Sequence, residues 1–274
     1  MGKDGVIDYT KKMIMDKKIS ILAILEPKKT QLKIQEYATK LGFNNYMHGG
    51  DINQHIWIFW KDNCQVVWVS SMEQAMTVKI KIHNMQIYST FVYAQCTRSA
   101  RKNLWDYIDQ QQYDKDNWIL GGDFNCVLKA SEKSGGNHPC ITSISDFNSC
   151  LINNNLSELN YKGNPFTWGN NQQGKKRIWE KLNRILMNGT AFNNLPDMDV
   201  IHLPRSFSDH APLWFKLTTP PDIKRRFRFQ KMWIDHKDFK ALIAENWNIN
   251  IQGHIGYVIT EKLRRTRKAL KHWN

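Results

Sequence analysis

A carboxylate and an amide stand two residues apart, directly after a short apolar run. The segment Trp118-Ile-Leu-Gly-Gly-Asp-Phe-Asn125 predicts a buried strand that ends in Asp123 and Asn125. Ligands of α/β sheets bind at such strand ends. Asp123 can accept a proton from water, Asn125 can donate to a phosphate oxygen, and the two glycines would let a phosphate approach the backbone. A Gly-Gly turn capped by Asx hydrogen bonds explains the same residues equally well.

Two further groups with useful chemistry lie beside predicted strands. Asp209 and His210 come just before an apolar run and offer a metal ligand and a proton donor in one place. Glu26 ends the apolar run 19–25. A surface turn explains the Asp-His pair alone, and a strand-end charge explains Glu26 alone. Together with the first motif they form an oxygen-rich set of the kind that magnesium prefers.

The elements that must position these groups alternate between strands and helices. Apolar-polar alternation or a continuous apolar run predicts strands, and helical spacing of apolar residues predicts helices. Strands are predicted at residues 19–25, 56–60, 66–69, 77–82, 87–94, 118–120 and 211–217, and helices at 6–18, 101–112, 145–151, 239–247 and 257–273. The run 19–25 is expected to be buried on both faces of a sheet. The pattern predicts a mixed α/β domain.

Composition sets limits on the class of protein. A chain of 274 residues with 41% hydrophobic residues can bury a core, which excludes wholesale disorder. The apolar runs are far shorter than the ~20 residues that a membrane span needs, and no signal-peptide pattern opens the chain. Five cysteines without a CxxC pair do not predict a disulfide framework or a cysteine-zinc site. We expect a soluble intracellular protein.

The charge is strongly basic and unevenly placed. The net charge is +14, and residues 222–274 hold 13 Lys and Arg against five Asp and Glu. This balance favours a polyanionic partner, although a solvated basic surface explains it about as well. The segment 218–221 (Thr-Thr-Pro-Pro) interrupts the strand pattern, so we place a domain boundary at about residue 220. A domain at 1–220 would be followed by a basic helical extension at 221–274, which opens with the basic-aromatic stretch Lys224–Trp233.

Six motifs in one order carry a resemblance to a known family. They are Leu25-Glu-Pro-Lys28, Val92-Tyr-Ala94, Gly121-Gly-Asp-Phe-Asn125, Phe166-Thr-Trp168, Trp179-Glu-Lys-Leu-Asn-Arg184 and Ser208-Asp-His210. The chain resembles the endonuclease/exonuclease/phosphatase superfamily, which has the DNase I-like fold. It is most similar to the apurinic/apyrimidinic-type endonuclease domain of plant non-LTR (LINE-type) retrotransposon polyproteins. The resemblance covers nearly the whole chain, and residues 221–274 resemble the linker that leads to a reverse transcriptase.

The resemblance implies a fold and a reaction. The fold would be a four-layer α/β sandwich of two packed mixed sheets flanked by helices. The reaction would be hydrolysis of a DNA phosphodiester in the nucleus, with Mg²⁺ (or Mn²⁺) and no small-molecule cofactor or membrane. By the same resemblance Glu26 holds the metal, Asp123 orients and deprotonates water, and Asn125 grips the scissile phosphate. His210 stabilises charge on the phosphate, with Asp209 beside it as a metal-side or hydrogen-bonding carboxylate.

Two more roles follow from the resemblance. Tyr93 would donate a hydrogen bond to a phosphate oxygen, and Thr167 would assist on the DNA side. An ordinary strand aromatic and a β-branched strand residue are the alternatives for these two positions.

The sequence departs from the family pattern in two places. The family begins with a strand that carries Trp-Asn-x-Arg-Gly, and here Met1-Gly-Lys-Asp-Gly-Val6 stands directly before the first helix. We expect that strand to be missing and a gap or open edge to remain in a sheet. Asn183 stands where the family has the Asp that orients the catalytic histidine. An amide can accept a hydrogen bond from His210 but adds no charge to stabilise an imidazolium, and the corresponding change in a serine protease costs about 10⁴ in turnover.

These observations leave two main readings. The first is a metal-dependent DNA-nicking endonuclease of retrotransposon origin, impaired in this copy. The second is a catalytically inactive nucleic-acid-binding remnant of the same fold. A third, action of this fold on inositol phosphates or sphingolipids, is disfavoured by the linker-like segment 224–274.

Overall fold

The computed structural model describes residues 5–195, 198–217, 229–253 and 255–273. The chain divides into two units, Met1–Pro220 and Pro221–Asn274. In the first unit the helices are α1 (Val6–Lys17), α2 (Ile34–Leu41), α3 (Arg98–Asp109), α4 (Ile141–Asn153) and α5 (Gly189–Asn194). Short 3₁₀ turns lie at Gln31–Lys33, Ala130–Glu132 and Gly174–Lys176.

Six strands form the largest sheet, in the order β4-β5-β6-β7-β13-β9. Their bounds are β4 (Cys64–Met72), β5 (Ala75–Ile82), β6 (Met85–Tyr93), β7 (Trp118–Asp123), β9 (Leu156–Glu158) and β13 (Asn183–Asn188). The pair β6 and β7 is parallel and the other neighbours are antiparallel, so the sheet is mixed. The parallel pair brings the carboxyl ends of β6 and β7 to one edge of the sheet, where ligands of α/β folds bind.

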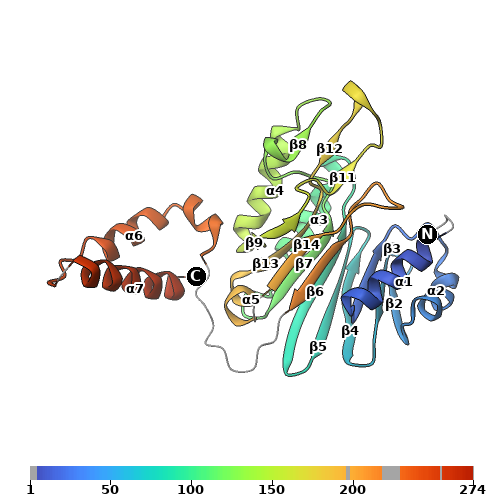
Figure 1. The fold of residues 1–274 in the computed structure, drawn as a ribbon, viewed down its shortest axis with the longest axis horizontal. Coiled ribbons are helices and arrows are strands. Elements are labelled where there is room, and N and C mark those ends of the chain that lie inside the picture. The colour runs from blue at the N-terminus through green and yellow to red at the C-terminus, as the bar shows by residue number, and fades with distance from the viewer. Residues whose placement is uncertain (1–4, 196–197, 218–228, 254, 274) are drawn as a thin grey trace. The chain divides into compact units, whose positions relative to one another are not determined.

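Two three-stranded sheets lie on one face of this large sheet (Figure 1). One has the order β1-β3-β2, with β1 (Ile21–Leu25), β2 (Asn45–Gly49) and β3 (Asn53–Trp60). The other has the order β10-β14-β15, with β10 (Tyr161–Gly163), β14 (Met198–His202) and β15 (Leu213–Leu217). A small third sheet of β8 (Lys133–Ser134), β11 (Trp168–Gly169) and β12 (Trp179–Glu180) stands beside them.

Side chains that alternate along β3 pack into the cores on both sides of its sheet. Ile56 and Ile58 face the large sheet and pack with Met76, Val78 and Ile80. Trp57 and Phe59 point to the other face and pack against α1 and α2. Successive strand side chains face opposite sides, so one apolar strand can serve two cores.

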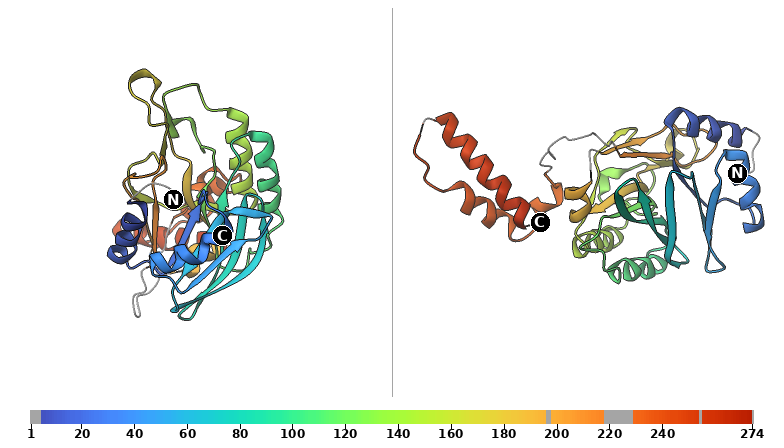
Figure 2. Two further views of the ribbon diagram at one scale, coloured as in Figure 1. Left: turned by 90° about the vertical axis from the view of Figure 1, so that its right-hand side faces the viewer. Right: turned by 90° about the horizontal axis from the view of Figure 1, so that it is seen from below.

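The outer face of the large sheet is covered by α3 and α4 (Figure 2). Their apolar side chains pack on buried residues of the sheet, and Trp105 stacks on Phe147 with ring centroids 4.8 Å apart. The order of layers is therefore helices, six-stranded sheet, two three-stranded sheets, helices. This is the four-layer α/β sandwich that the sequence analysis expects.

The strand β1 differs from its expectation in one respect. The sequence predicts burial on both faces, but all five residues of β1 are only half-buried. Among the described strands β1 pairs with β3 alone, in antiparallel register, so it is an edge strand. A continuous apolar run does not distinguish a central strand from an apolar edge strand.

A second edge strand, β15, pairs with β14 alone among the described strands. Ile21 and Leu25 of β1 belong to a cluster that includes Phe91 of β6. Phe215 of β15 belongs to a cluster that includes Ile87 of the same strand. The strand β1 contacts β6, and β15 contacts β13. We call the junction between the edges of β1 and β15 the seam.

The helix α1 bridges the seam through side-chain contacts. Ile14 packs in the core beneath the β1-β3-β2 sheet. Tyr9 contacts the Phe207 ring at 5.8 Å, and the Lys17 amine lies 4.8 Å from the centroid of the Trp214 ring on β15. One helix therefore contacts both three-stranded sheets.

The second unit is a helical hairpin of α6 (Phe239–Trp247) and α7 (Ile255–Trp273), preceded by a 3₁₀ turn at Lys231–Asp235. Its aromatic rings cluster: the Trp233 ring centroid lies 5.4 Å from that of Phe229 and 6.2 Å from that of Trp273. Much of the basic-aromatic stretch expected at 224–233 lies outside the described residues. Among the described residues, no helix has the length and apolar character needed to cross a membrane.

Candidate active site

Two strands of the large sheet, β6 and β7, end where the neighbouring strand β13 begins. The parallel register of β6 and β7 places Tyr93 beside Asp123. The antiparallel register of β13 and β7 places Asn183 on the other side of Asp123. The strand pairing alone therefore brings together three residues that are up to 90 positions apart in the sequence.

His210 lies between two of these residues. Its Nδ1 is 2.8 Å from the Oδ1 of Asn183, and its Nε2 is 3.7 Å from the Oδ2 of Asp123. The Asn183 oxygen can only accept, so the Nδ1 of His210 carries the proton of this bond. The Nε2 then faces Asp123.

Asp123 is a buried carboxylate, 3% exposed. Burial raises the pKa of Asp123 above its ordinary value, while His210 and the hydrogen bond from the Asn125 N–H act in the opposite direction. The carboxylates of Asp209 and Glu26 add to the increase. A carboxylate whose pKa is raised in this way is a stronger base than an exposed one, which suits proton transfer.

Asn125 is held in a turn directly after β7. Its φ is +45°, in the left-handed region that Asn tolerates better than most residues. The backbone N–H donates to the Oδ1 of Asp123 at 3.0 Å, and the Nδ2 donates to the Ala94 carbonyl at 2.6 Å. An amide nitrogen carries two hydrogens, so one remains for a phosphate oxygen.

The glycines before Asp123 serve the sheet. Gly122 has φ +147°, and a Cβ added there would lie 2.0 Å from the Val92 carbonyl oxygen on β6. A Cβ on Gly121 would meet the Ile185 side chain of β13 at 2.7 Å. The structure gives these glycines a reason within the sheet, because the absence of a Cβ lets β7 lie close to its two neighbours. The expectation that they also admit a phosphate stays a prediction.

Glu26 and Tyr93 form the opposite wall of the site. Glu26 follows β1 with φ +48°, and its backbone N–H donates to the His55 carbonyl at 2.7 Å. Burial, the charges of Glu26 and Asp123, and a hydrogen bond with Glu26 raise the pKa of Tyr93 to about 12. Tyr93 therefore keeps its proton at neutral pH and can act as a donor.

Asp209 is exposed and fixed by its neighbours. Trp168 Nε1 donates to the Oδ2 of Asp209 at 3.0 Å, and the Gly169 N–H donates to its backbone carbonyl at 3.1 Å. Partial burial acts to raise the pKa of Asp209, but the hydrogen bond from Trp168 and the charge of His210 outweigh it and lower the pKa. Asp209 is therefore ionised at neutral pH.

Thr167 lies in a different place from the one expected. Its side chain is fully buried, and its Oγ1 accepts from the backbone N–H groups of Leu182 at 2.9 Å and Asn183 at 2.8 Å. Its carbonyl accepts from the Ala211 N–H at 2.6 Å. The expected DNA contact is replaced by an internal role, because Thr167 ties the segment that holds Asn183 to the segment that holds His210.

The carboxylates fit a hard divalent cation with few protein ligands. In the described part of the chain no three His, Cys, Asp or Glu side chains are close enough to form a metal centre by themselves. Magnesium binds through one or two carboxylates, with waters and substrate phosphate completing the shell. The carboxylates of Glu26 and Asp209 both raise the pKa of Asp123, so three negative groups share one region that a cation would neutralise.

Two residues of this region were missed in the sequence analysis as site residues. Trp168 fixes Asp209, and the Arg205 Nη1 donates to the Asp209 carbonyl at 3.2 Å. The Phe166-Thr-Trp168 motif is a signal that pointed to Trp168. Arg205 stands in a loop without periodicity, so its position could not be read from the sequence.

Solved structures resemble most of this chain. The endonuclease domain of TRAS1, a telomere-specific non-LTR retrotransposon, matches with TM-score 0.59 and 15% identity, over 80% of this chain and 95% of that one. The AP endonuclease LMAP from Leishmania major matches with TM-score 0.58 and 11% identity, over 78% and 83%. The 3′ phosphatase NExo from Neisseria, bound to a product DNA hairpin, matches with TM-score 0.57 and 14% identity, over 79% and 95%.

The fold is DNase I-like. No protein-family model and no curated protein matches the sequence, so the likeness is one of three-dimensional structure. The matched proteins include nucleases and a phosphatase.

Proposed function

We propose that this chain is a divalent-metal-dependent phosphodiesterase that nicks DNA in the nucleus. The observation that carries the proposal is the placement of His210 between Asn183 and the buried Asp123, at strand ends of a DNase I-like fold. The titratable groups differ as catalysis requires: burial raises the pKa of Asp123, whereas Asp209 stays ionised. The nuclease neighbours support DNA as the substrate class.

The side chains then have distinct tasks in the hydrolysis. Asp123 takes the proton of the attacking water, whose oxygen bonds to phosphorus as the bond to the 3′ oxygen breaks. The leaving 3′ oxygen takes a proton from solvent, which gives a 5′-phosphate and a 3′-hydroxyl. Asn125 and Tyr93 donate hydrogen bonds to non-bridging phosphate oxygens, and His210 stabilises the charge that develops on them. Positioning and charge stabilisation of this kind supply most of the rate enhancement in phosphoryl transfer.

Glu26, with Asp209 on the other side of the site, would hold a Mg²⁺ or Mn²⁺ ion. When bound, such an ion supplies positive charge next to the phosphate. Thr167 contributes by holding Asn183 through the hydrogen bond to its backbone N–H.

Asn183 favours a second candidate, a DNA-binding protein without catalysis. The contact from His210 Nδ1 to the Asn183 oxygen keeps the imidazole oriented, but no carboxylate charge reaches it from that side. An imidazolium is then less stabilised than it would be beside an aspartate, which weakens the hydrolytic step and leaves DNA binding intact.

The test is nicking of supercoiled plasmid by the purified full chain with Mg²⁺. We expect slow relaxation that EDTA abolishes and that Asp123→Asn abolishes, whereas Asp51→Asn, an exposed aspartate on the turn between β2 and β3, leaves the rate unchanged. Absence of metal-dependent nicking by a folded chain that still binds DNA would establish the second candidate. Equal nicking by the Asp123→Asn variant would overturn the assignment of the site.

A further inference from the structure

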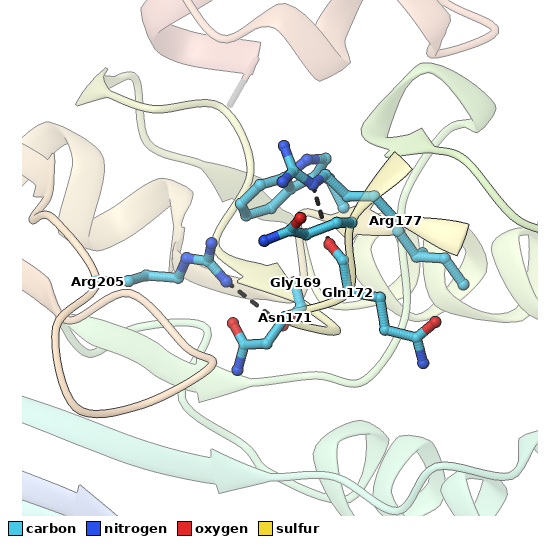
Figure 3. Close-up of a pocket in the computed structure, with 8 residues that line it drawn as sticks. Gly169, Asn171, Gln172, Arg177 and Arg205 are labelled. Atoms are coloured by element: carbon cyan, nitrogen blue, oxygen red, sulfur yellow. Dashed lines mark hydrogen bonds between the residues drawn. The ribbon is translucent and has the colours of Figure 1, made fainter. Parts of the chain in front are cut away.

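A small pocket lies beside the candidate active site, at the base of the hairpin between β11 and β12. Its volume is about 230 Å³, and Figure 3 shows Arg177 and Arg205 reaching it from two different loops. Gly169 lines the pocket and donates its N–H to the Asp209 carbonyl. The pocket is therefore adjacent to Asp209 of the candidate active site. The pocket volume is below the ~300 Å³ at which drug-sized ligand sites begin, so a single small group fits it.

Two guanidinium groups meet on one indole in this pocket. The Arg205 guanidinium lies 4.1 Å from the centroid of the Trp179 ring, and that of Arg177 lies 5.8 Å from it. Stacking on an aromatic face holds a guanidinium by its plane and leaves its edge N–H groups directed outward. Gly169 makes this approach possible, because a Cβ there would lie 2.5 Å from Trp179 and 2.7 Å from Arg205.

The donors of these two arginines are only partly used. Among the described hydrogen bonds, Arg205 uses Nη1, to the Gly169 and Asp209 carbonyls, and Arg177 uses Nε, to the Gln172 carbonyl. Each guanidinium has five N–H donors. The described ion pairs include none with either arginine. The charge of Asp209 acts on Arg205 without a described ion pair between them. Two neighbouring cations with spare donors can bind an anion with several oxygens.

We propose that Arg177 and Arg205, held by Trp179, bind a backbone phosphate of DNA next to the phosphate that is cleaved. The inference rests on the proposed action on DNA and assigns the pocket as the place where the strand is held. Lys175 and Lys176, exposed at the hairpin tip, extend the positive surface beyond the pocket. The pocket positions the strand and reads no base, because phosphate contacts carry register but no sequence information.

The experiment measures DNA affinity of the full chain against salt concentration, in an Asp123→Asn background that separates binding from cleavage. Each phosphate contact contributes about 0.9 to the slope of log K against log salt on duplex DNA. We expect Arg177→Gln and Arg205→Gln each to reduce the slope by about one. Gly169→Ala, which places a methyl group between Trp179 and Arg205, should weaken binding as well. The matched control is Lys79→Gln, which removes another cation stacked on an aromatic ring, 5.7 Å from the Tyr88 centroid and on a different sheet.

The outcomes separate this inference from the proposed function. A slope that is unchanged in Arg177→Gln, which does not touch Asp209, would overturn the pocket whether or not the wild-type chain nicks plasmid. An equal reduction in Lys79→Gln would also overturn it, because the effect would then report net charge alone. Loss of slope in both arginine variants without plasmid nicking by the wild-type chain would support the pocket and reject the nuclease.

Discussion

At the scale of single residues, Asn183 limits how well the proposed site can stabilise a charged His210. Asn183 Oδ1 accepts from His210 Nδ1 at 2.8 Å, in a buried position at the start of β13. The amide preserves the orientation of the imidazole and withholds a negative charge from it. Replacing Asn183 by aspartate would therefore add a negative charge next to His210 and keep the hydrogen bond that orients the ring.

We expect Asn183→Asp to increase plasmid nicking by at least tenfold, because a carboxylate there stabilises an imidazolium. The serine-protease change of about 10⁴-fold gives the upper scale. The initial rate of nicking at saturating Mg²⁺ measures it. Asn63→Asp, an exposed residue in the turn between β3 and β4, adds the same charge away from the site and should not change the rate. A rate that stays the same in Asn183→Asp would show that His210 works as a neutral imidazole.

Burial of the Asp123 carboxylate lowers the stability of the folded protein at neutral pH. Its folded-state pKa is raised above the ordinary value, chiefly by burial. A raised pKa means that the folded state binds the proton more tightly than the unfolded chain does. The contribution of this group to stability is therefore fully present below the ordinary pKa and is lost as the pH rises through the folded-state pKa.

The neutral replacement Asp123→Asn should therefore stabilise the protein at pH 7, by on the order of 1 kcal/mol, while abolishing nicking. The gain should shrink as the pH falls toward the ordinary pKa of an aspartate. Urea unfolding followed by tryptophan fluorescence at several pH values measures it. An equal gain at every pH would refute the role of the buried charge, and Asp51→Asn serves as the exposed control.

At the scale of secondary structure, the close approach of β7 to β6 aligns the strand ends that carry Tyr93 and Asp123. That approach depends on Gly122, where φ is +147° and a Cβ would overlap the Val92 carbonyl. We expect Gly122→Ala to reduce the free energy of unfolding by more than ~3 kcal/mol, through overpacking and backbone strain together.

The matched control is Gly42→Ala at the end of α2. Gly42 also has a positive φ, +79°, but has no atom within 4 Å of an added Cβ. Its replacement should cost only the ~1–2 kcal/mol of a left-handed residue. Chemical denaturation of both variants gives the comparison, and equal losses would mean that strain alone, without the contact to β6, explains Gly122.

The elements that the sequence predicted are those whose own side chains carry the signal. Alternation along 77–82 and 87–94 marked β5 and β6, and the apolar run at 118–120 marked β7. The strand β14 was missed because its five residues lack a clear alternation and depend on pairing with β10 and β15. The edge position of β1, the internal role of Thr167 and the packing role of Gly122 depend on which segments become neighbours, and local sequence does not contain that information.

At the scale of the whole molecule, exposed basic side chains gather on one face of α7. On α7 the exposed side chains Arg264, Arg267, Lys268 and Lys271 follow a spacing of three and four, which places them on one face. Arg264 and Arg265 pair with Glu261 at 2.6 and 3.1 Å. Among the described residues, Arg267, Lys268 and Lys271 have no ion pair.

We expect the triple change Arg267→Gln, Lys268→Gln and Lys271→Gln to reduce the salt slope of DNA binding by between one and three, because each lost phosphate contact removes about 0.9. The nicking rate at saturating DNA should not change. Fluorescence anisotropy with labelled duplex measures the slope. The control is the pair Arg264→Gln and Arg265→Gln, whose charges are already offset by Glu261 and which should change the slope less. An unchanged slope in the triple variant would exclude this face of α7 from DNA binding.

The seam between β1 and β15 has a consequence for how the site responds to heat. Glu26 follows β1 and His210 precedes β15, so the two residues are attached to different three-stranded sheets. Among the described strands, no backbone hydrogen bonds pair these two three-stranded sheets, and α1 contacts both. If α1 detached, the distance between Glu26 and His210 could increase while each three-stranded sheet stayed folded. We therefore expect warming to separate Glu26 from His210 before the cores on either side of the seam unfold.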